Sequence, residues 1–349
     1  MFCQIKKKIK IILMSSNAYR LTAPWYSGVG CILVFHRICP GEKRSVIKSI
    51  RGEEVTPEYL EAVIEYFRQT NYRIVSLNEV YSILKREIKI PEKFVAFTFD
   101  DGYADNYELA YPIFKKHSAP FAVYVTTGFI DGTAIMWPYL LDDLLMNNNR
   151  IEFDLKDRKR FFKCATAEEK EKAFLEISNS IKQLSLNDYY CELSKIFKQK
   201  VGDMCARTRE LAMGHKAIRE LSKDELVTIG SHTIHHLKLN TLSFLQARQE
   251  IMGSKQALQS MINKKVDHFS FPFGGNMDIG KREINIVNAC EFKTATTMTV
   301  ANIMSGHKDY LCSLPRIHVN GNDEDVNLLD MYVSGFFPCV NNRFKRTVV

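Results

Sequence analysis

The chain is predicted to be an α/β domain built around a mainly parallel sheet. Three observations in its 349 residues support this class. Short apolar runs with the composition of buried strands recur along the chain, helical capping signals lie between them, and several runs end directly at polar residues. Strands that alternate with helices are typical of parallel sheets, whose crossover connections are usually helical.

The expected strands are apolar runs, rich in β-branched and aromatic residues, that stop at a polar residue or a glycine. The first run ends at His36, and the second ends directly before Asp100. In chain order the six runs cover residues 29–36, 94–99, 121–127, 269–271, 292–297 and 311–319.

Helices are expected where capping residues precede helical patterns. Thr56 and Pro57 open a helix that runs to about residue 69. Residues 105–117 form a second pattern, and Ser243 with Gln246 three positions later predicts a capping box at the start of a long helix.

Residues 141–222 interrupt the alternation of strands and helices. This stretch is polar, rich in charge and mostly helical in pattern, with no clear strand. We therefore expect a helical insertion into the α/β domain. A lid, a partner surface and a plain structural excursion are all compatible with its sequence.

The net charge of +8 is concentrated at the two ends of the chain. We expect a basic N-terminal segment over residues 1–28, one main domain over 29–330 that contains the insertion, and a basic tail over 331–349. The body is nearly neutral and shows no basic-aromatic stripe, so a nucleic-acid partner is not expected. The ends are either solvated or attracted to an anionic membrane surface. Their basic residues are Lys6, Lys7, Lys8, Lys10, Arg343, Lys345 and Arg346.

The nine cysteines include no C-x-x-C pair, so they do not resemble a disulfide framework or a zinc ribbon. Free thiols in a reducing compartment fit this pattern better. The apolar run over residues 9–14 is interrupted by Lys10 and is too short for a cleaved export signal. We expect a cytoplasmic protein, with attachment to a membrane surface left open by the basic ends.

Two adjacent carboxylates, Asp100 and Asp101, follow the second expected strand and precede Gly102. The carboxyl ends of strands are where open α/β sheets build their sites. Adjacent residues near a strand end point in different directions, so one acid can bind a metal while the other faces a substrate. An ordinary turn would have the same Asp-Asp-Gly sequence.

Three of the nine histidines lie within five residues, as His232, His235 and His236. The i, i+4 spacing of His232 and His236 places both imidazoles on one side of a helical turn or tight helical loop, at chelating distance. His235 lies off this face and is expected to support the site or to be exposed. Surface or capping histidines are the alternative interpretation.

Two histidines and one aspartate form a facial ligand set with open positions, which is typical of a catalytic metal site. The other carboxylate can then act as general base toward a water whose pKa a metal lowers. Later in the chain, Pro272 and Gly274 flank Phe273 in a bend after a short strand. A backbone N–H exposed in such a bend can face a developing oxyanion, although an ordinary strand exit is equally compatible.

The order of these motifs, TFDDG, then HTIHH, then FPFG, resembles the polysaccharide deacetylase family, the NodB-like carbohydrate esterases. The resemblance covers roughly residues 29–140 and 222–320. It implies that residues 29–330 are a deacetylase catalytic domain, a deformed (β/α) barrel of the NodB type with a helical insertion. It also implies metal-dependent removal of an acyl group, usually N-acetyl, from an amino sugar.

By this resemblance Asp100 is the general base, and the main-chain N–H of Phe273 helps to bind the oxyanion. The implied metal ligands are Asp101, His232 and His236.

The sequence departs from the family pattern at two places. Ser270 lies where the family often has an arginine that orients the base, and the C-terminal Leu-x-His motif for the general acid is not clean. His36 resembles the early histidine of the permuted poly-N-acetylglucosamine deacetylase branch and is favoured as the acid because it ends a strand, with His318 as the alternative. Arg316 either orients Asp100 or simply caps the sheet. The expected substrate-binding residues are Tyr103, Pro272, Gly274 and Arg316.

The function expected from these residues is hydrolysis of the N-acetyl group of an amino sugar in surface-polysaccharide or glycolipid precursor metabolism. Zinc is the first choice of metal, with Co, Ni, Fe or Mn as alternatives. The substrate is expected to be nucleotide-linked, lipid-linked or an oligosaccharide, and Phe336 and Phe337 beside the basic tail would suit a lipid-linked one. An O-deacetylase or deformylase acting on a sugar, and a carbohydrate-binding homologue without turnover, are the alternatives.

Overall fold

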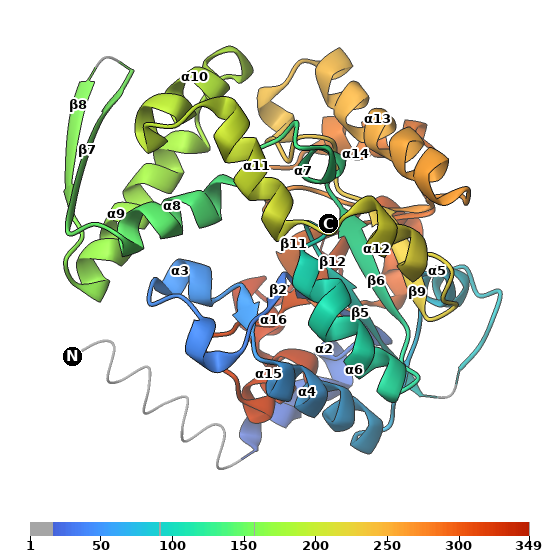
Figure 1. Cartoon of the computed structure of the whole chain (residues 1–349). Helices are drawn as coiled ribbons and strands as arrows, with labels where there is room; N and C mark the ends of the chain where they lie inside the picture. The colour runs from blue at the N-terminus through green and yellow to red at the C-terminus, as the bar shows by residue number, and fades with distance from the viewer. Residues whose placement is uncertain (1–16, 91, 157, 349) are drawn as a thin grey trace.

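The computed structural model describes residues 17–90, 92–156 and 158–348. Seven parallel strands in this part of the chain close into a barrel, because β1 pairs with β12 on one side and with β5 on the other. Helices surround the barrel (Figure 1). In order around the barrel, the strands are β1 (Gly30–Phe35), β12 (Leu314–His318), β11 (Thr294–Val300), β10 (His268–Ser270), β9 (Val227–Ser231), β6 (Phe121–Val125) and β5 (Lys93–Phe99), and β4 (Tyr72–Ile74) adds to the start of β5.

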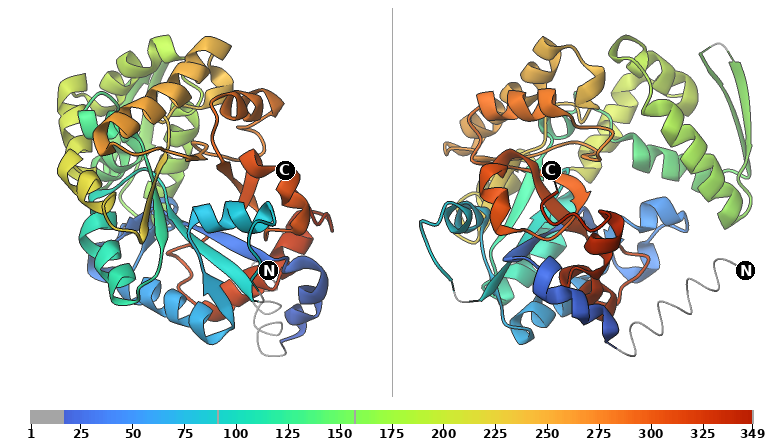
Figure 2. Two further views of the ribbon diagram at one scale, coloured as in Figure 1. Left: turned by 90° about the vertical axis from the view of Figure 1, so that its right-hand side faces the viewer. Right: turned by 180° about the vertical axis from the view of Figure 1, so that it is seen from behind.

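Helices make most of the connections between these strands, and two further pairs of short strands lie outside the barrel (Figure 2). The pairs are β2 (Arg37–Ile38) with β3 (Glu54–Val55), and β7 (Arg150–Leu155) with β8 (Arg158–Lys163). The α-helices are α2 (Ala23–Tyr26), α3 (Lys48–Arg51), α4 (Pro57–Gln69), α5 (Leu77–Leu84), α6 (Tyr111–Lys116), α7 (Thr127–Asp131), α8 (Trp137–Met146), α9 (Ala167–Ile181), α10 (Leu186–Phe197), α11 (Val201–Leu211), α12 (His215–Leu221), α13 (Phe244–Ile262), α14 (Lys281–Ala289), α15 (Val326–Val333) and α16 (Phe336–Asn341).

The predicted parallel α/β architecture is confirmed, since every pairing within the barrel is parallel. Each of the six predicted runs overlaps a barrel strand, while β4 and β9 were not predicted because both are short and only partly apolar. The predicted helical pattern over 105–117 is helical over Asn106–Ala110 and Tyr111–Lys116, but Asp105 makes no capping side-chain hydrogen bond with a described residue. The predicted helix starts at Thr56 and Ser243 are confirmed. Thr56 accepts a hydrogen bond from the Tyr59 N–H at 3.2 Å, and Ser243 forms the capping box of α13 with Gln246.

The strands alternate between two buried environments because successive side chains point to opposite faces. One face packs against the surrounding helices, as where Phe99 contacts Phe35 in a stacked ring pair and α6 through Phe114. The opposite face, with Ile32 and Tyr124, belongs to a separate buried cluster that also includes Leu77, Val80 and Leu84 of α5. This alternation places every second residue of a strand inside the barrel.

The insertion differs from its prediction in two respects. Residues 141–222 were expected to lack a strand, but β7 and β8 form an antiparallel hairpin at the edge of the molecule (Figure 1). Ile151, Phe153 and Leu155 are buried at alternate positions, a period of two that charged neighbours obscure in the sequence. The helical part begins at Trp137, a few residues before the predicted boundary.

The C-terminal segment is also more ordered than a solvated tail. The stretch predicted as a basic tail, 331–349, includes the end of α15 and all of α16, with Met331 and Cys339 buried. Phe336 and Phe337 are half-buried and pack beside Tyr332 against the small cluster of Tyr19, Leu328 and Met331, so they are not a fully exposed pair. In the described part of the chain, no helix is long and apolar enough to cross a membrane. The predicted N-terminal basic cluster, Lys6 to Lys10, lies outside the described residues.

Candidate active site

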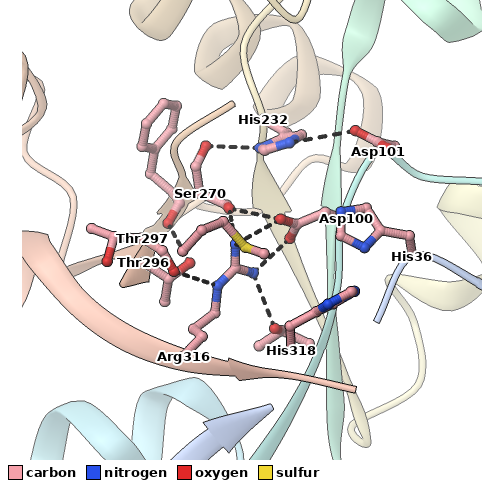
Figure 3. Close-up of polar contacts among 12 residues, drawn as sticks. His36, Asp100, Asp101, His232, Ser270, Thr296, Thr297, Arg316 and His318 are labelled. Carbon is pink, nitrogen blue, oxygen red and sulfur yellow. Dashed lines mark hydrogen bonds and ion pairs between the residues drawn. The ribbon is translucent and has the colours of Figure 1, made fainter. Parts of the chain in front are cut away.

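The chemically active side chains converge at the carboxyl ends of the barrel strands (Figure 3). Asp100 and Asp101 follow β5, His232 follows β9, and His36 follows β1, while His318 is the last residue of β12. Parallel strands present their carboxyl ends at the same edge of a sheet, and closure of the barrel brings these ends around one space. The fold thus joins motifs that lie far apart in the sequence.

Asp101, His232 and His236 form a cluster suited to a divalent metal. Asp101 Oδ1 lies 3.4 Å from His232 Nε2 and 3.3 Å from His236 Nε2, and the three donor atoms lie within 4.8 Å of one another. Asp101 Oδ1 is buried and has no hydrogen-bond partner among the described residues. A buried carboxylate oxygen without a partner is costly unless a cation binds it, so these residues fit a metal.

Other contacts prepare the two imidazoles for this task. The His232 Nδ1 lies 2.8 Å from the Ser270 carbonyl, where it donates a hydrogen bond and leaves Nε2 free to bind a metal. Burial lowers the pKa of His236 to about 4 and outweighs the attraction of Asp101, so this ring is neutral at pH 7. Burial alone would raise the pKa of Asp101, but the two imidazoles hold it below its ordinary value.

The local backbone differs from the expected helical turn. His232 to His236 form an irregular loop after β9, and both Thr233 (φ 66°) and His236 (φ 53°) adopt left-handed conformations. Asp101 is also left-handed, with φ of 71°. Such conformations are rare for non-glycine residues and mark functional sites when the surrounding structure enforces them.

Asp100 forms a fully buried ion pair with Arg316. The two Asp100 oxygens accept hydrogen bonds from Arg316 Nη1 and Nη2, each at 2.7 Å, and Ser270 Oγ lies 3.1 Å from Asp100 and 2.9 Å from Arg316 Nη2. Burial alone would raise the pKa of Asp100, but the guanidinium charge keeps it below its ordinary value. Asp100 is therefore an ionised carboxylate held in one orientation.

This arrangement decides between the two roles predicted for Arg316. Its side chain is 0% exposed, and its nitrogens also bond the Thr297 carbonyl and Thr98 Oγ1. Arg316 therefore positions Asp100. The prediction that it also binds substrate does not agree with its complete burial behind Asp100. It occupies an inward position of β12 two residues before His318, as the alternation of strand side chains requires.

The two candidate acids, His36 and His318, lie side by side on a shared carboxylate. Glu53 Oε2 lies 2.7 Å from His36 Nδ1 and 3.0 Å from His318 Nε2, and the two rings meet edge to face at 5.7 Å. Because Glu53 engages Nδ1 of His36, the Nε2 of that ring remains available to the cavity. Burial alone would lower the pKa of His36, but the carboxylates of Glu53, Asp101 and Asp100 outweigh it and raise the pKa to about 9.

Glu53 was not singled out in the sequence, and no motif or periodicity marks it. Burial alone would raise the pKa of Glu53, but His318 and His36 hold it well below its ordinary value. Glu53 is thus ionised and His36 is protonated where the two side chains meet. His36, Glu53 and His318 also form a second cluster whose donor atoms lie within 4.8 Å of one another, beside the Asp101 cluster.

The bend after β10 places Phe273 beside the metal-binding cluster. Its ring centroid lies 4.9 Å from that of His236, its φ is 61°, and its N–H donates no hydrogen bond to a described residue. Gly274 allows this bend, because a Cβ there would lie 2.9 Å from the backbone nitrogen of Met298. The expected oxyanion donor is therefore free to bind a ligand atom.

A cavity of about 480 Å³ is lined by Asp100, the Asp101 cluster, Phe273 and the two candidate acids with Glu53. Tyr103 lines it, as expected for a substrate-binding residue, whereas Pro272 and Gly274 are not among its described lining residues and instead shape the bend. One wall comes from the insertion, through α8 and α9. That wall, which includes Trp137 and Lys182, was not predicted to belong to the site.

Comparison with known proteins identifies the family to which the chain belongs. A family model described as polysaccharide deacetylase matches residues 87–185 and 193–295, which is more than half of the chain. The chain therefore belongs to the polysaccharide deacetylase family.

Individual relatives match over shorter stretches. A putative polysaccharide deacetylase of Bacillus subtilis, YxkH, is 32% identical over 94 residues, which cover 27% of this chain and 30% of the relative. The poly-β-1,6-N-acetyl-D-glucosamine N-deacetylase of Staphylococcus aureus is 30% identical over 83 residues, or 24% of this chain and 28% of the relative. Each match thus spans less than a third of the relative's length.

Solved structures resemble nearly the whole chain. The Streptococcus pyogenes deacetylase PplD, in complex with acetate, superposes with a TM-score of 0.57 at 19% identity, covering 87% of this chain and 97% of that one. IcaB from Ammonifex degensii gives a TM-score of 0.54 at 16% identity, covering 87% and 96%. These likenesses confirm the predicted deacetylase (β/α) barrel.

Proposed function

We propose that this protein is a metal-dependent deacetylase that hydrolyses the N-acetyl group of an amino sugar. The observation that carries the proposal is the meeting of three parts in one cavity. These are an Asp-His-His donor set, a carboxylate held ionised by a buried arginine, and a histidine held protonated by a glutamate. Hydrolysis of an amide requires a base for the attacking water and an acid for the leaving nitrogen, and the second and third parts supply them.

Asp101, His232 and His236 would hold the metal. When bound, a divalent ion polarises the acyl carbonyl and lowers the pKa of water. Zinc suits a set with two imidazoles, and Co, Ni, Fe or Mn suit the same mixture of nitrogen and oxygen donors.

The chain's own residues then move the protons. Asp100 accepts the proton of the attacking water as oxygen adds to the carbonyl carbon, and the Phe273 N–H donates a hydrogen bond to the oxyanion that forms. His36 Nε2 gives its proton to the nitrogen as the C–N bond breaks, which releases acetate and a free amine. Arg316 keeps Asp100 oriented throughout, and Glu53 keeps His36 protonated before transfer.

An N-acetylated amino sugar is the substrate class that fits best. Relatives bear names that specify poly-β-1,6-N-acetyl-D-glucosamine, and the cavity of about 480 Å³ has room for sugar residues. Trp137, in the insertion wall, offers an aromatic surface beside the polar groups. Oligosaccharide, nucleotide-linked and lipid-linked forms of the sugar share this acetamido group. The proposal includes all three.

Acetate release from a panel of acetylated sugars tests the proposal. The zinc-loaded protein is incubated with β-1,6-linked N-acetylglucosamine oligosaccharides, a nucleotide-linked N-acetylglucosamine and an O-acetylated sugar, with Asp100→Asn as the matched control. We expect acetate and free amine from an N-acetyl substrate with the parent protein alone. Release from the O-acetyl sugar only would assign the protein as an esterase, and tight sugar binding without release from any substrate would assign it as a binding protein.

A further inference from the structure

The two ends of the described chain together build an apolar surface group. Four large side chains there are strongly exposed: Leu21 at 75%, Trp25 at 58%, Val340 at 55% and Phe344 at 71%. Leu21 and Trp25 are four residues apart, as are Val340 and Phe344. We call these four residues the terminal patch.

Hydrogen bonds between the two chain ends hold the terminal patch in place. Tyr26 Oη donates a hydrogen bond to the Phe344 carbonyl at 3.1 Å, and Arg346 Nε donates one to the Trp25 carbonyl at 2.9 Å. Gly335, with φ of 88°, lets the two ends approach closely, since a Cβ there would lie 2.4 Å from the Tyr26 backbone. Helices α2, α15 and α16 lie together in this region (Figures 1 and 2). The fold thus holds the apolar groups at the surface.

Basic residues lie close to the terminal patch in the sequence. Arg343, Lys345 and Arg346 lie beside Phe344 in the chain, and residues 17–28 and 331–349 contain no acid. The sequence before residue 17 adds four lysines and again no acid. Aromatic side chains flanked by cations are typical of surfaces that enter the headgroup region of an anionic bilayer.

We propose that the terminal patch docks the protein onto an anionic lipid bilayer. Trp25, Phe344 and their apolar neighbours enter the headgroup boundary, and Arg343 and Lys345 contact anionic headgroups. Charge complementarity selects a bilayer over a second copy of the chain, because two copies joined at this patch would bring like charges together.

Docking in this way leaves the catalytic cavity free. The terminal patch lies near the amino-terminal end of the barrel strands. Ser27, two residues after Trp25 and three before β1 begins, accepts a hydrogen bond from Lys93 at the start of β5. His36 lies beyond the opposite end of β1, and a six-residue strand spans about 20 Å. A docked molecule therefore keeps its cavity open to substrate in solution.

Vesicle sedimentation with the full chain tests the proposal. Vesicles of phosphatidylcholine that contain about 30% phosphatidylserine, as a mimic of an anionic leaflet, are compared with vesicles of pure phosphatidylcholine. We expect binding to the anionic vesicles only, and about tenfold or more weaker binding for Trp25→Ser/Phe344→Ser. The matched control is Leu245→Ser, a residue 70% exposed at the start of α13, which should bind like the parent.

Removing basic side chains tests the electrostatic part of the proposal independently. Arg343→Gln/Lys345→Gln should weaken binding to anionic vesicles by about fivefold for each cation removed, and high salt should also weaken it. Lys216→Gln, in α12, should leave binding unchanged. Circular dichroism melts check that every variant is folded.

Three outcomes would overturn the proposal. The first is equal sedimentation of the parent with both vesicle types, and the second is binding of Trp25→Ser/Phe344→Ser as tight as that of the parent. The third is a dimer in analytical ultracentrifugation that this double variant disrupts. Because these measurements need no deacetylase substrate, they stand or fall separately from the proposed activity.

Discussion

Glu53→Gln, compared with His318→Ala, tests whether the Glu53 carboxylate sets the pKa of His36 as the general acid. The wild-type carboxylate lies 2.7 Å from His36 Nδ1 and 3.0 Å from His318 Nε2. Glutamine keeps the size and hydrogen-bonding capacity of this side chain but removes its charge. Any change in the titration of His36 is then attributable to charge rather than to a lost side chain.

The expected magnitude follows from the contact. The pKa of His36 is raised to about 9 despite burial, with Glu53 as the largest of the charges that raise it. Loss of an opposite charge in direct contact lowers such a pKa by about 1–3 units. A divalent ion bound at Asp101 would repel the imidazolium and lower the pKa of His36 in both proteins, so the comparison uses the difference between the two proteins.

The assay is the pH dependence of kcat/KM for acetate release by the metal-loaded protein. His36 must be protonated to act, so the alkaline limb should move down by about 1–3 pH units in Glu53→Gln, with about a tenfold loss for each unit at high pH. An acetyl ester with a good leaving group should be affected much less, because its alkoxide needs little help from a proton. His318→Ala is the control and should leave the alkaline limb in place.

Two results would refute this reasoning. An alkaline limb that stays in place in Glu53→Gln would show that Glu53 does not set the acid's pKa. A limb that vanishes in His318→Ala but persists in His36→Ala would assign the acid to the end of β12 instead.

Four further outcomes are expected. Asp100→Asn should retain metal, measured by metal analysis after dialysis, while kcat falls by roughly 10²–10⁴-fold, and loss of metal would mean that the roles of the adjacent carboxylates are reversed. His232→Ala and His236→Ala should each weaken metal binding by at least about tenfold, and unchanged affinity in the double variant would exclude both as ligands. Arg316→Leu should lower the free energy of unfolding in urea by about 3–5 kcal/mol, because it leaves a buried carboxylate unpaired, and adding Asp100→Asn should restore part of the loss. The raised pKa of His36 implies stability that is complete below its ordinary value of 6.5 and lost as pH rises through about 9, so thermal melts of the metal-free protein should show this loss in the parent and not in His36→Ala.

The sequence was sufficient for the parts of the site that local rules govern. An apolar run that ends in Asp100 and Asp101 identifies a strand and the end at which its polar residues emerge. The spacing of His232 and His236 marked them as a pair, although they meet through left-handed residues in a loop and not on a helical turn. Such signals can be recognised in a sequence because strand side chains alternate and because turn residues have strong conformational preferences.

The hairpin of β7 and β8 shows where the local rules failed. Its buried residues alternate with charged ones, and the charges made the stretch resemble the polar helices that follow it. Its buried face is defined only by the elements it packs against, including α9 and α10. Strand propensity depends on such packing more than helix propensity does.

Only the tertiary structure decided which residues lie together around Asp100 and the two candidate acids. Glu53 lies far from His318 in the sequence, and Arg316 lies 216 residues from Asp100. No period or motif links these residues, because the barrel brings them together only when β1 pairs with both β5 and β12. The sequence by itself identified six of the seven barrel strands, the candidate metal-binding residues and the two candidate acids. Closure of the barrel decided that Arg316 holds Asp100 and that one glutamate contacts both acids, since contacts between distant segments depend on how the strands pair and not on local sequence.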